Sequence, residues 1–225
     1  DTFFAGLIST EALAALSLSA SIFFMILAIA IGMSEALTSL VGNALGGKDV
    51  KKAQQIALNG IALAVALSVF LAIFGIVGAP YFLQILGDPS YIVQTLDYVN
   101  VILYATIFFI GSFFFNALLN ATGDTVSFRN VLIVTAFLNI FLDYIFVNTL
   151  SFGVKGVAFA TIISEFITMS YLFYKLEKTK LWTGFKEFKY DFEIIKELLK
   201  QGFGPSVNMF MMAFGMYVIT YFVAA

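Results

Sequence analysis

Long stretches without a charged residue constrain the fold of this chain more than any other feature of its sequence. Residues 12–34, 53–87 and 98–123 contain no Asp, Glu, Lys or Arg, and residues 130–150 and 156–174 contain one such residue each. A bilayer core about 30 Å thick needs roughly 20 residues of α-helix at 1.5 Å per residue. The runs therefore predict five membrane spans, and we expect an all-α, polytopic transmembrane helical bundle.

Both ends of the chain are apolar as well. The residues up to about Ile8 match the tail of a first helix, and residues 202–225 match the truncated start of a seventh. Asp1 opens directly onto TFFAGLIST, without the basic region or small-residue cleavage site of a signal peptide. We expect the chain to begin and end inside membrane helices, as a piece of a larger membrane protein.

Composition excludes several classes of function. With 61% hydrophobic and 12% charged residues, the chain has too little polar surface for a soluble globule. It contains no Cys and no His, which excludes disulfides, thiolate or imidazole metal sites and Ser-His-Asp triads. It has no GxxxxGK[ST] loop for ATP. We expect neither an enzyme nor an ATP-driven pump, with no cofactor and no nucleic-acid partner.

The basic residues are distributed unevenly between alternate loops. The turn at 48–52 holds three lysines, the next turn on that side holds Arg129, and residues 175–200 hold seven lysines, whereas the loops between them hold only Lys155. Basic residues concentrate in cytoplasmic loops. We therefore expect a multi-pass protein of the inner or plasma membrane whose loops 2–3, 4–5 and 6–7 face the cytoplasm.

Residues 175–201 are the one soluble-looking segment. Apolar residues recur there at helical spacing (Phe188, Phe192, Ile195, Leu198 and Leu199) between charged ones. This pattern favours an amphipathic cytoplasmic linker on the membrane surface, with a plainly solvated linker as the alternative. We therefore divide the chain into a six-helix lobe (1–174), this linker, and a truncated seventh helix (202–225) with Pro205 in its first turn.

Three acidic residues fall deep within the predicted spans: Asp1, Asp143 and Glu165. Placing a charged side chain in a membrane span costs about 2.5–3.5 kcal/mol on insertion scales, so we expect each of these residues to have a structural or functional role. Asp143 lies nine residues before the outer turn at Phe152, and Thr161 lies nine residues after it. Asp1 lies eight or nine residues from the preceding outer turn. Counting therefore places Asp1, Asp143 and Thr161 at a similar depth.

Two further spacings extend this group. Asn139 and Asp143 are four residues apart and share a helix face, as do Thr161 and Glu165. We expect two carboxylates, an amide and a hydroxyl to converge in the outer half of the membrane. Such oxygen ligands suit a hard cation such as Na⁺, or a proton shared by two acids. The alternative is that they only hydrogen-bond neighbouring helices.

Six motifs resemble the MATE (multidrug and toxic compound extrusion) family in order and spacing: DTFFAG, SEALTSLVGNALGGKD, NALLNATGDT, LNIFLDYIFV, GVKGVAFATIIS and LKQGFGPS. Together they cover the whole chain. The resemblance implies a twelve-helix transporter of two six-helix lobes that rock around a central cleft. It also implies export of amphipathic or cationic small molecules in exchange for Na⁺ or H⁺. The chain would supply the N-terminal lobe and the start of helix seven, with membrane lipid and the C-terminal lobe as its partners.

In the archaeal and DinF-like branch of that family, an Asp of helix one, an Asn and an Asp of helix five and a Thr of helix six bind the cation. The resemblance assigns these roles to Asp1, Asn139, Asp143 and Thr161, the group that the depth count brings together. The chain departs from the branch at Tyr144, where a Pro is common, and at Glu165, where a small or apolar residue is expected.

Two questions stay open in the sequence. Glu35 lies nearer the cytoplasm and either lines a vestibule or pairs with a loop cation; with Glu165 it is a candidate for an additional polar cavity. A lipid-linked precursor flippase of the same superfamily is the alternative function, and it would need a basic cavity for phosphates. Arg129 and Lys155 are the candidates for such a cavity and both lie at loop level, so we favour the antiporter.

Overall fold

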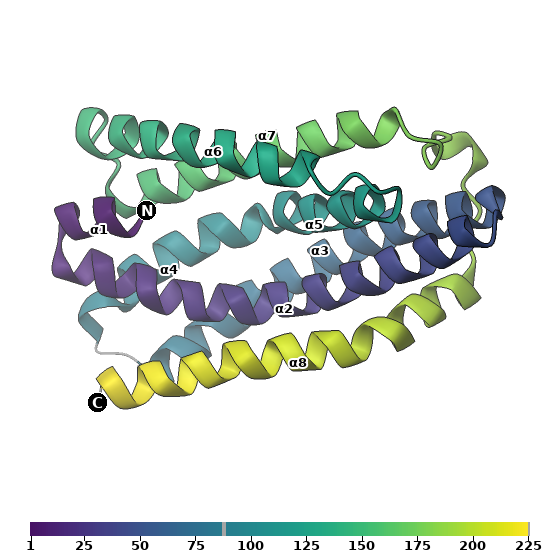
Figure 1. Cartoon of the computed structure of the whole chain (residues 1–225). Helices are drawn as coiled ribbons and strands as arrows, with labels where there is room; N and C mark the ends of the chain where they lie inside the picture. The colour runs from purple at the N-terminus through teal and green to yellow at the C-terminus, as the bar shows by residue number, and fades with distance from the viewer. Residues whose placement is uncertain (87–88, 225) are drawn as a thin grey trace.

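The chain folds into a bundle of helices that lie side by side along a common direction (Figure 1). The computed structural model describes residues 1–86 and 89–224. Its elements, in chain order, are α1 (Thr2–Ile8), α2 (Thr10–Gly46), α3 (Val50–Leu86), α4 (Pro89–Tyr104), α5 (Thr106–Ala121), α6 (Ser127–Asp143), a π-helical segment (Tyr144–Thr149), α7 (Gly153–Glu177), a 3-10 turn (Phe185–Glu187) and α8 (Phe192–Ala224).

Among the described residues, four helices are long and apolar enough to cross a membrane, and a bent pair of helices counted as one span makes a fifth. Three are the helices Thr10–Gly46, Val50–Tyr81 and Gly153–Glu177, and a fourth is α6 continued to Thr149. The fifth is a pair, α4 from Thr95 and then α5, with a bend of 50° at the break between them. These segments coincide with the five charge-poor runs, so the all-α, multi-pass prediction is confirmed.

Helix α2 lies at the centre of the bundle and packs on α3, α4, α5 and α8. The largest fully buried side chains belong mostly to this region, among them Leu37, Leu58, Leu103 and Phe114. By contrast, one face of α3 carries exposed apolar side chains at helical spacing, namely Val69, Phe70, Ile73, Phe74 and Val77. Such a face is stable against lipid, which solvates apolar side chains and no backbone polar group.

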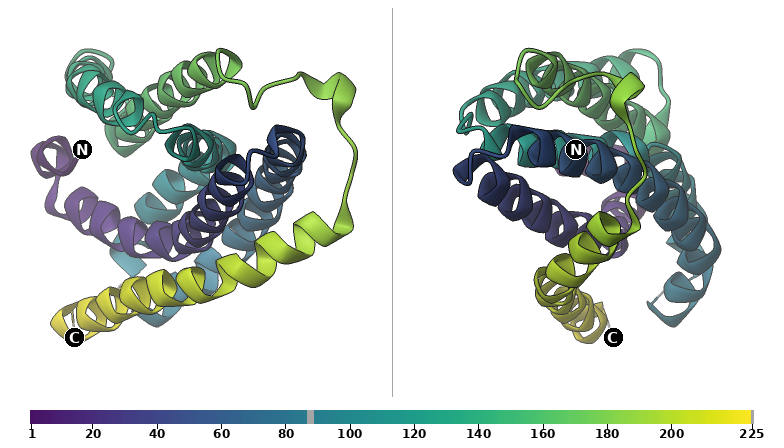
Figure 2. Two further views of the ribbon diagram at one scale, coloured as in Figure 1. Left: turned by 45° about the vertical axis from the view of Figure 1, so that its right-hand side comes forward. Right: turned by 90° about the vertical axis from the view of Figure 1, so that its right-hand side faces the viewer.

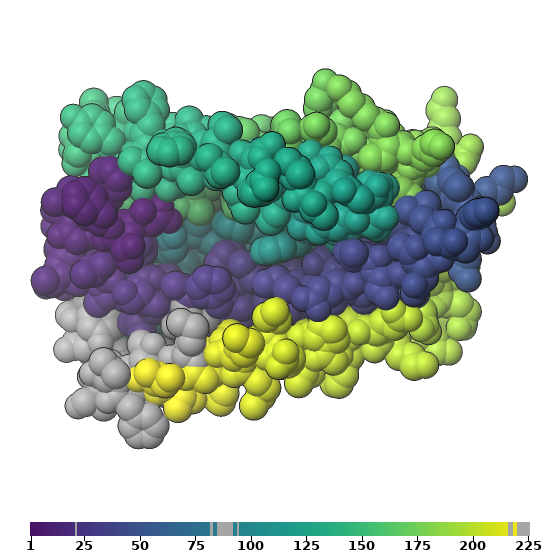
Figure 3. All heavy atoms as spheres, in the orientation of Figure 1, coloured from purple at the N-terminus to yellow at the C-terminus, as the bar shows by residue number. Residues whose placement is uncertain are grey.

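Helix α8 lies along one side of the bundle and does not enter it (Figures 1 and 2). It follows α2 for much of its length, and the space-filling view shows the two surfaces in contact (Figure 3). Two glycines permit this approach. A Cβ on Gly32 would lie 2.2 Å from the backbone nitrogen of Ser206, and one on Gly202 would lie 3.1 Å from the Cα of Met33. Ser206 then donates a hydrogen bond of 3.1 Å to the Ile29 carbonyl.

The start of α8 differs from the sequence-based expectation. The helix begins at Phe192, so Pro205 lies in its interior and not in its first turn. Residues 192–201 are thus continuous with the last helix, and Leu198 is fully buried in the main core. Interior prolines are tolerated in membrane helices because neighbouring groups satisfy the freed carbonyls. The division of the chain into lobe, linker and seventh helix stays a prediction.

The connection from α7 to α8 is held on α3 by three amide side chains. Gln54 donates to the Lys180 carbonyl at 2.7 Å and Gln55 to the Glu187 carbonyl at 3.1 Å. Asn59, which is fully buried, donates to the Lys189 carbonyl at 3.0 Å and accepts from the Asp191 N–H at 3.0 Å. These bonds fix the backbone of the connection onto the first turns of α3.

Candidate functional site

Asp143 is the last residue of α6, at the point where the helix changes form. The next residues, Tyr144–Thr149, form a π-helical turn, closed by a hydrogen bond of 2.9 Å from the Leu150 N–H to the Ile145 carbonyl. Single π-turns within helices occur often at functional sites. The Asp143 side chain is fully buried, and neither carboxylate oxygen has a hydrogen-bond partner among the described residues. A carboxylate in this position needs a positive charge or a proton.

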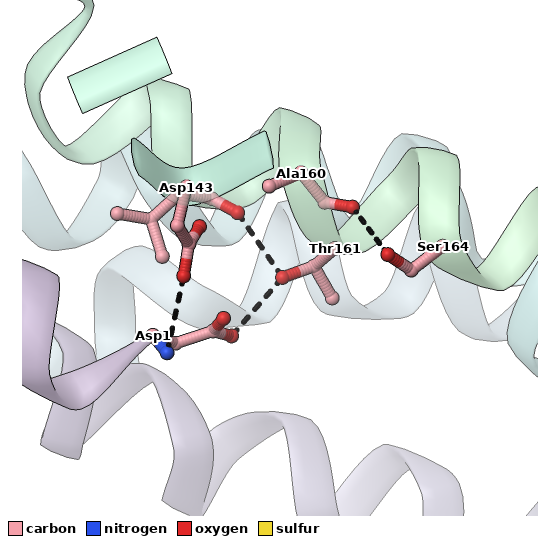
Figure 4. Close-up of polar contacts among 6 residues, drawn as sticks. Asp1, Asp143, Ala160, Thr161 and Ser164 are labelled. Atoms are coloured by element: carbon pink, nitrogen blue, oxygen red, sulfur yellow. Dashed lines mark hydrogen bonds and ion pairs between the residues drawn. The ribbon is translucent and has the colours of Figure 1, made fainter. Parts of the chain in front are cut away.

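Asp1 and Thr161 lie directly beside Asp143 (Figure 4). The backbone nitrogen of Asp1 lies 3.2 Å from Asp143 Oδ2. The hydroxyl of Thr161 lies 3.0 Å from Asp1 Oδ2 and 3.1 Å from the Val157 carbonyl, so its single proton serves two acceptors. Asp1 and Thr161, which are 160 positions apart in the chain, are thus in contact, as the equal counts from the loops predicted.

Tyr98 of α4 is a fourth member of this group that the sequence reasoning missed. Its phenol interacts with Thr161 and with the charge of Asp143. A signal was present: Tyr98 lies about nine residues from the outer loop between α3 and α4, the same count that located Asp143 and Thr161. A phenol supplies one more oxygen ligand and one more proton donor.

The remaining predicted residues lie elsewhere. Asn139 is half-buried on α6, one turn before Asp143, and within the described chain no hydrogen bond joins it to the others. Glu165 is half-buried on α7, where it accepts a hydrogen bond of 3.3 Å from Ser112 on α5. Glu35 is exposed on α2, roughly 37 Å beyond Thr10 at 1.5 Å per residue, so it does not join the group.

The chemistry available to this group follows from its atoms. Two carboxylates, a hydroxyl and a phenol offer hard oxygen ligands and exchangeable protons, and they lie on α4, α6, α7 and the residue that precedes α1. The group is therefore suited to binding and releasing a small cation or a proton.

Fold and group together define a class: a multi-pass helical membrane protein with a buried carboxylate among its packed helices. Comparison with known proteins identifies the family. The MatE family model matches residues 1–145, and the chain belongs to this family.

Curated relatives agree with this membership. The chain is 30% identical over 225 residues to the "Probable multidrug resistance protein NorM" of Thermotoga maritima, an alignment that covers 96% of the chain and 48% of that protein. It is 27% identical to the "Probable multidrug resistance protein YoeA" of Bacillus subtilis, over 96% of the chain and 49% of that protein. The chain thus spans about half the length of the curated relatives it matches.

A solved structure has the same fold. The inward-facing conformation of a multidrug resistance MATE family transporter of the MOP superfamily superposes with a TM-score of 0.89 at 26% identity, over 96% of this chain and 50% of that one. The family and its membrane fold are therefore established, and the relatives are transporters and not enzymes.

Proposed function

We propose that residues 1–225 form the N-terminal half of a cation-coupled antiporter that exports amphipathic or cationic organic compounds by alternating access. The observation that carries this proposal is the fully buried Asp143, which lies beside Asp1 and has no hydrogen-bond partner for either carboxylate oxygen among the described residues. Asp1 in turn accepts a hydrogen bond from Thr161. Asn139 lies one turn away on the same helix and is proposed to join when a cation binds. The names of the relatives support a multidrug substrate range.

Coupling follows from linkage between two sites. A Na⁺ or H⁺ bound at Asp143 neutralises a buried charge and so stabilises the conformation in which α1, α6 and α7 enclose it. If the substrate binds the opposite conformation better, each ligand lowers the affinity for the other by the same factor. Alternating binding of cation and substrate then moves them in opposite directions.

The remaining parts of the proposal concern orientation and assembly. The uneven distribution of lysines supports cytoplasmic loops at 48–52, at Arg129 and at 175–200. The position of α8 at one side of the bundle, with exposed apolar residues such as Phe203 and Met212, supports its assignment to a second lobe. That second half would complete the substrate cleft, and residues 1–225 alone are not expected to transport.

The proposal is tested by efflux of a fluorescent organic cation from vesicles that contain the complete transporter. Asp143→Asn keeps the shape of the side chain and removes its charge, so cation-driven efflux should be abolished while membrane insertion is unchanged. Thr161→Ala removes one neutral ligand and should reduce efflux less. Asp97→Asn is the matched control, because Asp97 is a partly exposed acid of α4 that pairs with Lys155 at 3.2 Å. Normal ion-driven efflux in Asp143→Asn would contradict the proposal.

A further inference from the structure

Polar residues continue inward from the site along the seam where α5, α6 and α7 meet. Each helix contributes them at intervals of about one turn, so that they share one face of their helix. They are Ser112, Asn116 and Asn120 on α5, Thr135, Asn139 and Asp143 on α6, and Thr161, Glu165 and Thr168 on α7. Helix α7 packs closely against both α5 and α6.

Contacts between helices join these residues at successive depths. At the outer level, Thr161 contacts Asp1, which contacts Asp143. At the middle level, the Ser112 hydroxyl donates to Glu165 Oε2 at 3.3 Å. At the next level, the buried hydroxyls of Thr168 and Thr135 lie 3.3 Å apart. The seam between these three helices is thus polar over at least two helical turns.

Glu165 is the titratable group in the middle of this seam. It lies twelve residues from either end of α7, about 18 Å from each at 1.5 Å per residue. Helix α5 carries no ionisable residue, and α6 carries only Arg129 at its start and Asp143 at its end. Asp97 and Tyr98 of α4 lie toward the outer end, while Tyr104 is exposed.

Among the residues that the structure describes, no counter-ion therefore accompanies this carboxyl group. Within residues 1–86 and 89–224 Glu165 takes part in no ion pair, and its recorded partner is a single neutral hydroxyl. Well-characterised hard cations such as Ca²⁺ take six or more oxygen ligands, many more than one carboxyl and one hydroxyl provide. A proton needs only the carboxyl group itself.

The inner end of the seam opens into a hollow. Asn116, Asn120, Thr125 and Arg129 line it with apolar neighbours; the hollow is open to the surface of the bundle, and its volume is about 640 Å³. Asn116 Oδ1 is buried and has no hydrogen-bond partner among the described residues. A water at this position would satisfy that oxygen and extend the polar seam to the hollow.

We infer that Glu165 is a second proton-binding site, on a polar track that connects the Asp1–Asp143–Thr161 group with the hollow at Asn116 and Arg129. A proton leaves the Asp143 carboxyl group for a water or hydroxyl of the track, binds a carboxyl oxygen of Glu165, and then leaves Glu165 for water in the hollow; at each step one O–H bond breaks and one forms. This inference rests on the proposed function, because it supplies a route for protons between the coupling carboxylate and the hollow.

Proton binding is measured directly, without transport, by pH-difference infrared spectroscopy on the purified protein. A band of a protonated carboxylic acid should disappear in Glu165→Gln, which keeps the acceptor for Ser112, and persist in Glu177→Gln, an exposed acid of the same helix. Ser112→Ala should shift the frequency of that band, because it removes the hydrogen bond. Identical spectra for the unmodified protein, Glu165→Gln and Ser112→Ala would overturn the inference.

A second measurement separates this inference from the proposed function. In vesicles with the complete transporter, Glu165→Gln should slow substrate-driven proton flux on the order of 100-fold, the lower range for a positioned proton-transfer group. Unchanged flux in Glu165→Gln with loss of flux in Asp143→Asn would overturn the track and leave the antiporter intact. Unchanged flux in both variants would overturn both.

Discussion

Asn59 provides a quantitative test of how the connection between α7 and α8 is anchored. Its buried side chain makes two hydrogen bonds to that connection, one to the Lys189 carbonyl and one from the Asp191 N–H, both of 3.0 Å. Asp191 in turn caps α8, because its carboxylate accepts from the N–H groups of Glu193 and Ile194 at 2.9 and 3.2 Å. Loss of the two Asn59 hydrogen bonds is therefore expected to loosen the start of α8.

The expected magnitude follows from the number of bonds. A typical buried hydrogen bond contributes about 1 kcal/mol, so Asn59→Ala should destabilise the docked connection by about 2 kcal/mol. Each 1.4 kcal/mol is a factor of ten, which makes the open form about 30-fold more populated. The connection carries exposed lysines at 186 and 189, so trypsin cleavage there reports the open population when opening is fast relative to cleavage.

The assay compares initial cleavage rates in detergent. Asn59→Ala should be cleaved about 30-fold faster than the unmodified chain at these lysines. Gln55→Ala, which removes one exposed bond of 3.1 Å to the Glu187 carbonyl, should increase the rate only a few-fold. Lys51→Ala, an exposed residue on the same helix, is the matched control and should not change it. A change of less than about threefold in Asn59→Ala would refute the reasoning.

Three further predictions concern packing, pH and topology. Gly32→Leu should push α8 away from α2 and lower the free energy of unfolding by about 1–3 kcal/mol, which is measured as a lower melting temperature. Gly42→Leu, at an open position, should not lower it. In the loop before α6, hydrogen bonds from the Ser127 hydroxyl and backbone N–H lower the pKa of Asp124 below 3.8. Because the folded-state pKa is depressed, these bonds stabilise the fold at neutral pH, and this stabilisation is lost as the pH falls below 3.8. Acid titration of Asp124→Asn should therefore show a smaller loss of folding stability than that of the unmodified chain. Cysteines introduced at Lys178 and Ser151 should react with an impermeant thiol reagent from the cytoplasmic and outer side respectively, and the reverse pattern would invert the proposed orientation.

Much of the architecture was predictable because a helix rises by a fixed amount per residue. Charge-free runs of sufficient length located the spans, and equal counts from the loops placed Asp1, Asp143 and Thr161 together. The same count applied to Tyr98 would have added it, but a tyrosine near a membrane interface has an ordinary role as an anchor there. Depth counting alone does not give the rotation of a helix, which is why Asn139 has the predicted depth without a contact to the group.

Local departures from regular helix were less predictable. Proline is the residue most often associated with helix kinks. The π-turn after Asp143 nevertheless begins with Tyr144, and the bend at Ala105 also contains no proline. The course of α8 through Pro205 depends on tertiary packing against Gly32 and Met33. These features arise from contacts between helices distant in sequence, which local patterns do not report.

The central claim, that Asp143 couples cation movement to export, is tested most directly by measuring the cation itself. The complete transporter is placed in vesicles with an outward substrate gradient and no ion gradient, and the internal Na⁺ and pH are followed with reporter dyes. We predict that substrate exit drives Na⁺ or H⁺ inward in the unmodified protein and in Asp97→Asn, and that Asp143→Asn abolishes this movement. Cation entry of unchanged size in Asp143→Asn would contradict the account.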